Sequence, residues 1–359
     1  MGEVPTEMPD SDRSGASLQD SGSRSLSEED LRLIHALQID PRAAWSRIGQ
    51  ALGIDATTAA RRWQRLSADG LAWTTAYTST TTQVAYIWLR CAPSALPAVC
   101  DQVCRDPYVF GVDRLDGEWD LLLCVAVDEM SDLDDVVLTR LRSTPGLQAV
   151  RSAVATRMYF DGSNLRAQAL EPTASAVLAG ARDRPAPAGR GLRDEDAGLI
   201  LALGADARVP ASRLAASARK SEATVRRRIE ALRRAGVLVL RCDFAHPLAG
   251  WRTNVTVRAQ LPAGRLDALA STLQTWPQIR MCVATAGGRS NLLLMGMLRR
   301  PEDLIALEAK LGSTFTDLRV TERSIILRSL KRMGRLLDAE GRAIGMVPLG
   351  AAGRPPAPA

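Results

Sequence analysis

Two short stretches of the chain, residues 57–65 and 224–233, combine threonines with several arginines at helical spacing. Each guanidinium group presents a rigid fork of donors that fits phosphate oxygens and the major-groove edge of guanine. Residues three or four positions apart share one face of a helix, so these side chains can act together. The chemistry indicated is contact with double-stranded DNA, and the candidate residues are Thr57, Thr58, Arg61, Arg62, Arg65, Thr224, Arg226, Arg227, Arg228 and Arg233.

Histidines and cysteines offer little for catalysis or metal binding. The chain has only two histidines, His35 and His246, and neither copy of the repeat described below contains a Ser/His/Asp set, a paired-carboxylate pattern or a phosphate loop. Cys100 and Cys104 lie one helical turn apart, but no second pair or nearby histidine completes the four ligands that zinc needs. We therefore expect no enzyme activity, no metal and no cofactor.

Length and composition restrict the class of protein. A chain of 359 residues has room for two to four domains of about 100–200 residues, and 46% hydrophobic with 24% charged residues is typical of globular proteins. No apolar run reaches the roughly 20 residues that span a bilayer, and no secretory signal is visible. We expect a cytoplasmic protein whose net charge of +6 is compatible with a polyanionic partner.

The strongest pattern is an internal repeat, which predicts a tandem duplication. The first aligned segment needs no gap, and it places Asp30 on Asp196 and Arg61-Arg62 on Arg227-Arg228. The similarity then continues more faintly. The matching segments are 26–71 with 192–237, 117–123 with 288–294, and 147–159 with 318–330.

The first half of each copy predicts two helices, a short turn, a third helix and a strand, the order of a winged helix-turn-helix. Ser27 and Asp30 resemble a capping box at the start of the first helix. Gly53 and Gly70 can end the second and third helices in the left-handed conformation that glycine adopts easily. In copy two, Ser221 can cap the third helix.

Apolar positions determine which face of each third helix lies inward. The arginines then occupy the outer face, where DNA would be read. A solvated basic face is the alternative for one copy alone, but two copies with arginine at the same register favour DNA binding. The inner positions are Ala59, Trp63 and Leu66 in copy one and Val225, Ile229 and Leu232 in copy two.

The second half of each copy predicts the order βαββαβ, a ferredoxin-like module. Such a module leaves one face of its sheet uncovered, and an identical module in a dimer usually covers it. In copy one the expected strands are 84–89, 109–115, 121–127 and 147–158, and the expected helices are 94–105 and 131–142.

Together these motifs resemble the Lrp/AsnC (feast/famine) family of transcriptional regulators. The resemblance rests on Asp40-x-Arg42, on Arg61-Arg62 to Gly70, on the loop Gly117–Asp120, and on the hinge-like stretch Asp243–Gly250. It implies a winged helix-turn-helix followed by a small-molecule-binding βαββαβ module. The departure is the duplication, because the family's usual chain has one unit.

The resemblance also implies an effector site, where an amino acid or related metabolite binds near the loop that begins at Gly117. A carboxylate there can pair with an ammonium group, whereas the amide in copy two can only form a hydrogen bond with it. A plain hairpin turn is the alternative. The candidate effector residues are Gly117, Trp119, Asp120, Gly288 and Asn291.

The sequence thus predicts an α+β protein with two winged helix-turn-helix units, each followed by a ferredoxin-like module. The expected boundaries are a disordered segment 1–24, helix-turn-helix 25–75, module 76–160, linker 161–190, helix-turn-helix 191–241, module 242–333 and flexible tail 334–359.

We expect a sequence-specific transcriptional regulator that binds DNA and a small effector, with its modules pairing within the chain and in a homo-oligomer. Two alternatives differ in class. Siroheme decarboxylases share the two-module architecture and rely on histidines, so an enzyme of that kind is the first alternative. The second is an architectural DNA-binding protein without an effector.

Overall fold

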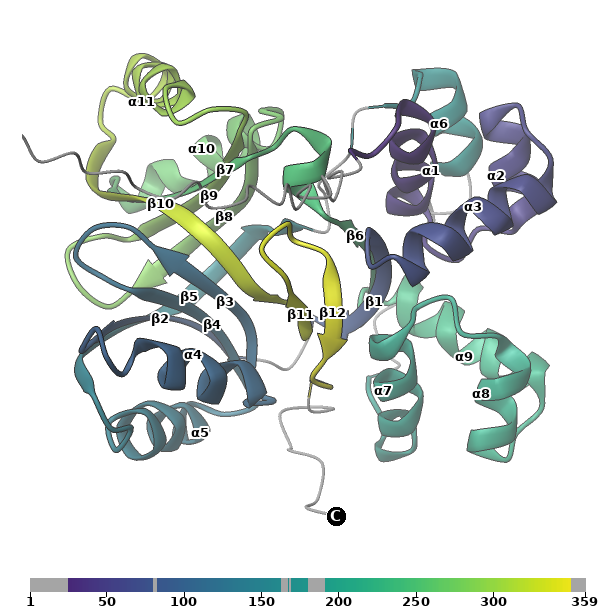
Figure 1. The fold of residues 1–359 in the computed structure, drawn as a ribbon, viewed down its shortest axis with the longest axis horizontal. Helices are drawn as coiled ribbons and strands as arrows, with labels where there is room; N and C mark the ends of the chain where they lie inside the picture. The colour runs from purple at the N-terminus through teal and green to yellow at the C-terminus, as the bar shows by residue number, and fades with distance from the viewer. Residues whose placement is uncertain (1–24, 80–82, 163–166, 168, 180–190, 350–359) are drawn as a thin grey trace, which may run out of the picture.

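The computed structural model describes residues 25–79, 83–162, 167, 169–179 and 191–349. Both halves of the chain show the same order of elements, three helices and a strand followed by βαββαβ. In Figure 1 the helical units lie together on the right, and the strands form a single body on the left. The predicted α+β class and the predicted module order are therefore confirmed.

The helices of the helix-turn-helix units begin and end at the capping residues that the sequence predicted. The capping box of α1 is present, because the Ser27 hydroxyl accepts from the Asp30 N–H while the Asp30 carboxylate accepts from the Ser27 N–H. Ser221 caps α9, and Gly53 ends α2 at φ +69°. The helices are α1 (Glu28–Ile39), α2 (Trp45–Leu52), α3 (Ala56–Ala68), α7 (Ala197–Ala205), α8 (Ala211–Ala218) and α9 (Glu222–Arg234), with a short η3 (Asp194–Asp196) before α7.

The strands that follow the two helical units pair with each other. β1 (Ala72–Thr78) and β6 (Leu238–Phe244) form an antiparallel two-stranded ribbon with Ala72 opposite Phe244 and Thr78 opposite Leu238. Each unit therefore completes its wing with a strand from the other half of the chain. The sequence predicted both strands but contained no local signal for this pairing.

The two βαββαβ modules share the same topology. In each, the first and third strands are central, as in a ferredoxin-like sheet. The first module contains β2 (Gln83–Cys91), α4 (Leu96–Arg105), β3 (Val109–Leu115), β4 (Leu121–Val127), α5 (Met130–Asp134) continued by the π-helix η1 (Asp135–Leu141), and β5 (Leu147–Phe160). The second contains β7 (Thr253–Gln260), η5 (Ala263–Arg265), α10 (Leu266–Leu273), β8 (Ile279–Ala286), β9 (Leu292–Leu298), α11 (Asp303–Thr314) and β10 (Arg319–Arg332), preceded by η4 (His246–Ala249).

Long strands join the two sheets into a closed eight-stranded barrel. β5 pairs with β2 in its own module and then with β8, while β10 pairs with β7 and then with β3. The inner faces of the two sheets bury a shared apolar core that includes Tyr86, Trp88, Trp119, Met281 and Met295. The open face of each module is therefore covered by the other half of the same chain.

Two predicted boundaries need correction. Residues 334–349 do not form a flexible tail, because β11 (Arg335–Leu337) pairs with the open edge of β10 and β12 (Ala343–Met346) pairs with β11. The predicted linker contains α6 (Pro172–Ala179), which packs on α2 and buries Leu178 in the first helical core. Composition suggested loops because proline, glycine and arginine are frequent next to both segments, in 180–191 and 350–359. The predicted disordered segment 1–24, the Pro/Gly-rich stretch 182–190 and the end 350–359 lie outside the described residues.

Gly70 and Gly236 occupy corresponding positions in the two halves, and comparing them tests how closely the β11–β12 hairpin packs on the first helix-turn-helix unit. Gly70 and Gly236 both follow a third helix with φ near +65° to +69°, but a Cβ on Gly70 would lie 2.3 Å from the Ala343 carbonyl oxygen, whereas a Cβ on Gly236 meets nothing within 4 Å. We expect Gly236→Ala to lower the free energy of unfolding by about 1–2 kcal/mol, the cost of the left-handed conformation. Gly70→Ala should cost clearly more. Urea unfolding of both variants compares them, and equal losses would contradict the close packing of β12 on Gly70.

Candidate nucleic-acid interface

The outer face of α3 carries the expected arginines. Ala59, Trp63 and Leu66 are buried, so the opposite side of the helix, with Thr57 and Arg61, is exposed. Arg61 has no carboxylate oxygen within 4 Å in the described part of the chain. A long cationic side chain without an internal partner is available to a phosphate or a base edge.

The remaining candidates on α3 are partly committed to the protein. The Arg65 guanidinium lies 2.6 Å from the Asp30 carboxylate, and Arg62 lies 3.7 Å from Glu29 and 4.0 Å from Asp30. Arg65 keeps more than half of its side chain exposed, and Arg62 keeps about a quarter. Thr58 is half-buried. Arg65 can therefore turn to DNA more easily than Arg62.

On α9 the structure separates three consecutive arginines into two groups. Arg226 and Arg227 are exposed; Arg226 pairs with Glu222 one turn earlier at 2.9 Å, an exposed contact of little strength. Arg228 donates to the buried Asp196 and to the Gly191 carbonyl, and this pairing raises the pKa of Arg228. Thr224, half-buried beside the cap, donates its N–H to Ser221.

Arg233 is directed toward the first unit rather than outward. Its guanidinium lies 3.2 Å from Asp40 and 3.6 Å from Glu230, and only about a fifth of its side chain is exposed. Of the ten predicted contacts, the structure thus gives Arg228 and Arg233 roles in holding the fold. The exposed set consists of Thr57, Arg61, Arg65, Arg226 and Arg227.

Sequence reasoning noted the repeated Asp40-x-Arg42 pattern but missed its role. Arg42 donates to the carbonyl oxygens of Ala207 (2.6 Å) and Val209 (3.1 Å) in the second unit. The corresponding Arg208 donates to the carbonyl oxygens of Pro41 (2.7 Å) and Ala43 (3.1 Å) in the first unit. Each arginine therefore binds the loop between the first two helices of the other unit.

This reciprocal clasp, made of Arg42 and Arg208, is half-buried. Arg208 also stacks on Trp45 with its guanidinium carbon 3.8 Å from the ring centroid, and burial lowers the pKa of Arg208 to about 10. Charged donors to carbonyl oxygens are among the stronger hydrogen bonds. The clasp and the β1–β6 ribbon together fix one helix-turn-helix unit against the other (Figure 1).

The predicted effector loops have matching structural contacts in the two modules. Asp120 accepts the Cys91 N–H at 2.7 Å, and Asn291 accepts the Leu261 N–H at 3.0 Å while donating to the Leu261 carbonyl. Both side chains therefore tie the loop to the end of a neighbouring strand, which an acid or an amide can do equally.

The remaining effector candidates are two glycines in left-handed conformations and one buried tryptophan. Gly117 and Gly288 have positive φ values of +84° and +110°, which favour glycine. Trp119 is buried, and the guanidinium of Arg151 stacks over its ring at 4.5 Å. The loop geometry is that of a tight turn, and it leaves open space around Gly117.

Both histidines are buried and bonded. His35 Nδ1 accepts main-chain N–H groups of Ala169 and Leu170, which holds the segment before α6 onto α1. His246 Nδ1 lies 3.0 Å from an Arg332 nitrogen; arginine can only donate, so the ring proton sits on Nε2. Within the described ranges no cluster of three or more His, Cys, Asp or Glu residues could hold a metal ion, and no helix is long and apolar enough to cross a membrane.

His246 predicts a measurable dependence of stability on pH. Burial, followed by the charge of Arg332, lowers the pKa of His246 to about 3. An unfolded histidine titrates near 6.5, so between about pH 6.5 and 3 the unfolded chain binds the extra proton and stability falls as the pH falls. We expect the wild type to lose up to about 1.4 kcal/mol per pH unit more than His246→Gln. Urea unfolding at about pH 6 and pH 4 measures both, and parallel losses would contradict a neutral buried imidazole.

Two winged helix-turn-helix units with exposed arginines, carried on paired βαββαβ modules, define a helix-turn-helix regulator. Residues 26–67 match the family model of the AsnC-type helix-turn-helix domain, and residues 84–165 match that of the Lrp/AsnC ligand binding domain. The first half of the chain thus matches both domains of the Lrp/AsnC family of transcriptional regulators.

The relatives support the same class. An uncharacterized HTH-type transcriptional regulator of Pyrococcus abyssi is 29% identical over 147 residues, which cover 38% of this chain and 93% of the relative. One from Pyrococcus horikoshii is 29% identical over 133 residues, covering 34% and 87%. Among solved structures, the siroheme decarboxylase NirDL superposes with a TM-score of 0.56 at 16% identity over 85% of this chain and 93% of that chain, a likeness of fold alone.

Proposed function

We propose that this chain is a sequence-specific transcriptional regulator that reads DNA with two unlike recognition helices, α3 and α9, the products of a tandem duplication. The observation that carries the proposal is the pair of exposed arginine faces, held side by side by the reciprocal clasp and the β1–β6 ribbon. A protein with this role works in the cytoplasm, where its DNA is.

Selection of bound fragments from genomic DNA, followed by footprinting, tests the proposal. α3 presents Arg61 behind Thr57, whereas α9 presents Arg226 and Arg227 behind Glu222. Since the helices differ, one chain should protect two half-sites of different sequence, about one helical turn or a multiple apart. A footprint that is a perfect palindrome would contradict separate reading by the two units, and no selected fragments would contradict DNA binding.

We propose further that an amino acid or related metabolite modulates the regulator at the Gly117–Asp120 loop. The family match to a ligand binding domain over residues 84–165 supports this, as does the open space around Gly117. The backbone contact of Asp120 does not require a carboxylate, because Asn291 makes the same contact.

The substitution Asp120→Asn therefore separates effector binding from folding. We expect it to leave stability and ligand-free DNA binding unchanged and to abolish the ligand's effect on DNA affinity, because the ammonium group loses its counter-charge. Calorimetric titration of the twenty amino acids into both proteins measures the effect. A response that survives the substitution, or no heat from any amino acid, would leave the loop as a hairpin turn.

An enzyme on this architecture is the alternative, prompted by the NirDL fold. The histidines argue against it, because His35 and His246 are both buried and each has an acceptor nitrogen occupied by protein donors. Incubation with siroheme under reducing conditions and analysis of the product test this directly. Loss of carboxyl groups from siroheme would favour the enzyme, and unchanged siroheme would favour the regulator.

A further inference from the structure

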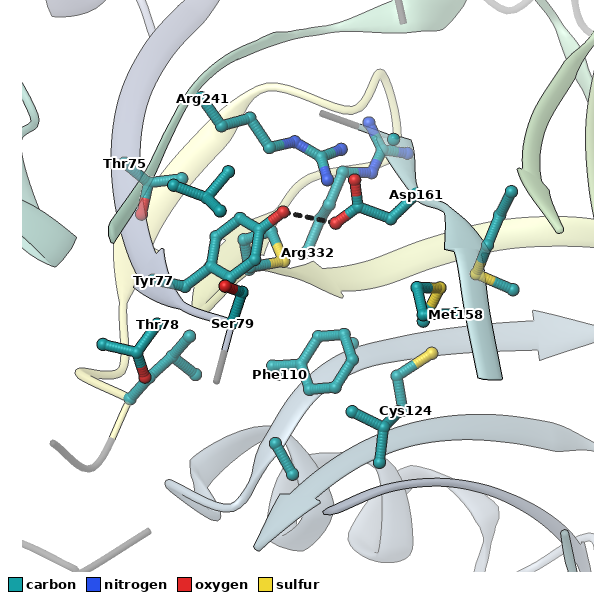
Figure 2. Close-up of a pocket in the computed structure, with 18 of the residues that line it drawn as sticks. Thr75, Tyr77, Thr78, Ser79, Phe110, Cys124, Met158, Asp161, Arg241 and Arg332 are labelled. Carbon is teal, nitrogen blue, oxygen red and sulfur yellow. Dashed lines mark hydrogen bonds between the residues drawn. The ribbon is translucent and has the colours of Figure 1, made fainter. Parts of the chain in front are cut away.

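A cavity of about 670 Å³ lies between the barrel, the β1–β6 ribbon and α7, away from the Gly117–Asp120 loop. Its volume is that of about twenty water molecules at roughly 30 Å³ each, so it can hold a cofactor-sized molecule. Figure 2 shows Arg241 and Arg332 on one side of it, with Phe110 and Cys124 on the opposite side. Aromatic and thioether side chains supply much of the apolar lining, among them Tyr86, Phe110, Met158, Met281 and Met295.

Cationic side chains outnumber acidic ones on the cavity wall. Two of the five cations have carboxylate partners, since Arg157 lies 2.9 Å from Asp267 and Arg241 lies 2.7 Å from Asp243. The two wall acids are also bonded, Asp113 to the Ser329 hydroxyl and Asp161 to the Tyr77 hydroxyl. The wall cations are Arg157, Arg241, Arg280, Lys331 and Arg332.

Three of these cations are buried without a carboxylate. Arg280, Lys331 and Arg332 are 9%, 1% and 8% exposed, and within the described chain no carboxylate oxygen lies within 4 Å of any of them. Among the described residues, the hydrogen-bond acceptor of the Arg280 side chain is the Met295 sulfur at 3.4 Å, a weak acceptor.

In the described part of the chain, the other two cations have neutral hydrogen-bond partners. Lys331 donates to the Asp106 carbonyl at 2.8 Å, and Arg332 reaches the neutral ring of His246 and the Ser329 hydroxyl. Burial lowers the pKa of Lys331 to about 8 and that of Arg332 to about 10.

Buried charges in proteins are normally paired, because desolvation without a counter-charge is costly. The cavity wall carries five cations against two acids, Asp113 and Asp161, so it has a net positive charge that an anion would balance. We propose that this cavity binds an organic anion with an apolar body, whose carboxylate pairs with Arg280 and Arg332. The inference concerns the chain alone and does not depend on DNA binding.

Fluorescence titration with a matched pair of probes tests the charge requirement. The probes are 1-pyrenebutyrate, an aromatic carboxylate, and 1-pyrenebutanol, its neutral counterpart with the same ring system and chain. We expect the full-length protein to bind the carboxylate at least about tenfold more tightly, because charge-assisted hydrogen bonds form only with the anion. Equal affinities, or no binding of either probe, would overturn the proposal.

Substitutions locate the site. Arg280→Met should weaken pyrenebutyrate binding about tenfold or more and leave pyrenebutanol binding unchanged. Arg328→Met is the control, since Arg328 lies on β10 with Arg332 but is exposed and outside the cavity. A loss of the same size in the control would overturn the assignment.

Thermal unfolding without a probe supplies an independent readout. Because an unpaired buried cation destabilises the empty protein, Arg280→Met should unfold at the same or a higher temperature than the wild type. A large fall in Tm, or failure to fold, would show that Arg280 stabilises the empty chain and would overturn the proposal.

Discussion

Replacing Arg226 and Arg227 together with alanine is expected to weaken DNA binding by about 2–6 kcal/mol, at about 1–3 kcal/mol for each arginine that contacts a base. Both side chains are exposed on α9, and the only ion pair between them and the described protein is the surface contact of Arg226 with Glu222. Fluorescence anisotropy with a selected site measures the loss. Where an arginine contacts phosphate instead, its loss should reduce the slope of log K against log salt concentration by about one.

The control for this experiment is Arg300→Ala, because Arg300 is three-quarters exposed and lies between β9 and α11, outside both helix-turn-helix units. It should bind DNA as the wild type does. Unchanged affinity of the double variant, in a protein whose unfolding transition is intact, would show that α9 is not a recognition helix.

Replacing Glu322 with arginine is expected to lower the free energy of unfolding by about 2–4 kcal/mol. The Glu322 carboxylate lies 2.6 Å from Arg151 and 3.1 Å from Arg258, and all three side chains are at least two-thirds buried. Removing one partner of a buried pair costs about 3–5 kcal/mol, and partial exposure reduces that loss while the added cation increases it. Urea unfolding followed by circular dichroism measures the difference.

Glu302→Arg is the matched control, because Glu302 is exposed and its closest cation is 4.0 Å away. Its effect should stay within about 0.5 kcal/mol. If Glu322→Arg is equally mild, the cluster of Glu322, Arg151 and Arg258 does not hold the two modules together.

This cluster joins positions that correspond in the alignment of the two halves. The alignment of Leu147 with Leu318 places Arg151 on Glu322, and these corresponding residues face each other across the barrel. Trp88 and Arg258 also correspond, opposite Leu122 and Leu293, and Arg258 stacks over Trp88 at 4.7 Å. Two copies of the first module would bring Arg151 against Arg151, so these contacts favour the unlike pairing.

Local signals in the sequence predicted the elements well. Caps such as Ser27 and glycines such as Gly53 act within one helical turn, so their positions fix helix ends without knowledge of the rest of the chain. The inner faces of α3 and α9 were equally clear, because Trp63 and Ile229 lie on a regular apolar stripe.

Contacts between distant segments could not be predicted. Secondary-structure propensity and hydrophobic periodicity carry no information on contacts between residues far apart in the chain. Such contacts form the β1–β6 pairing, close the barrel and pack α6 on α2. Arg227 and Arg228 are adjacent arginines that the sequence does not distinguish. In the structure Arg228 points inward because it pairs with the buried Asp196. The repeat did contain a hint, since Asp30 with Arg62 aligns with Asp196 and Arg228.

The β1–β6 ribbon has a consequence for synthesis of the chain. β1 ends at Thr78 and its partner begins at Leu238, so at about 5–20 residues per second β1 leaves the ribosome roughly 10–30 s before β6 exists. During that interval the first half exposes unpaired strand edges that a neighbouring nascent chain can occupy. Domain-swapped dimers, in which β1 of one polypeptide pairs with β6 of another, are therefore the misassembly to expect when ribosomes crowd on one message.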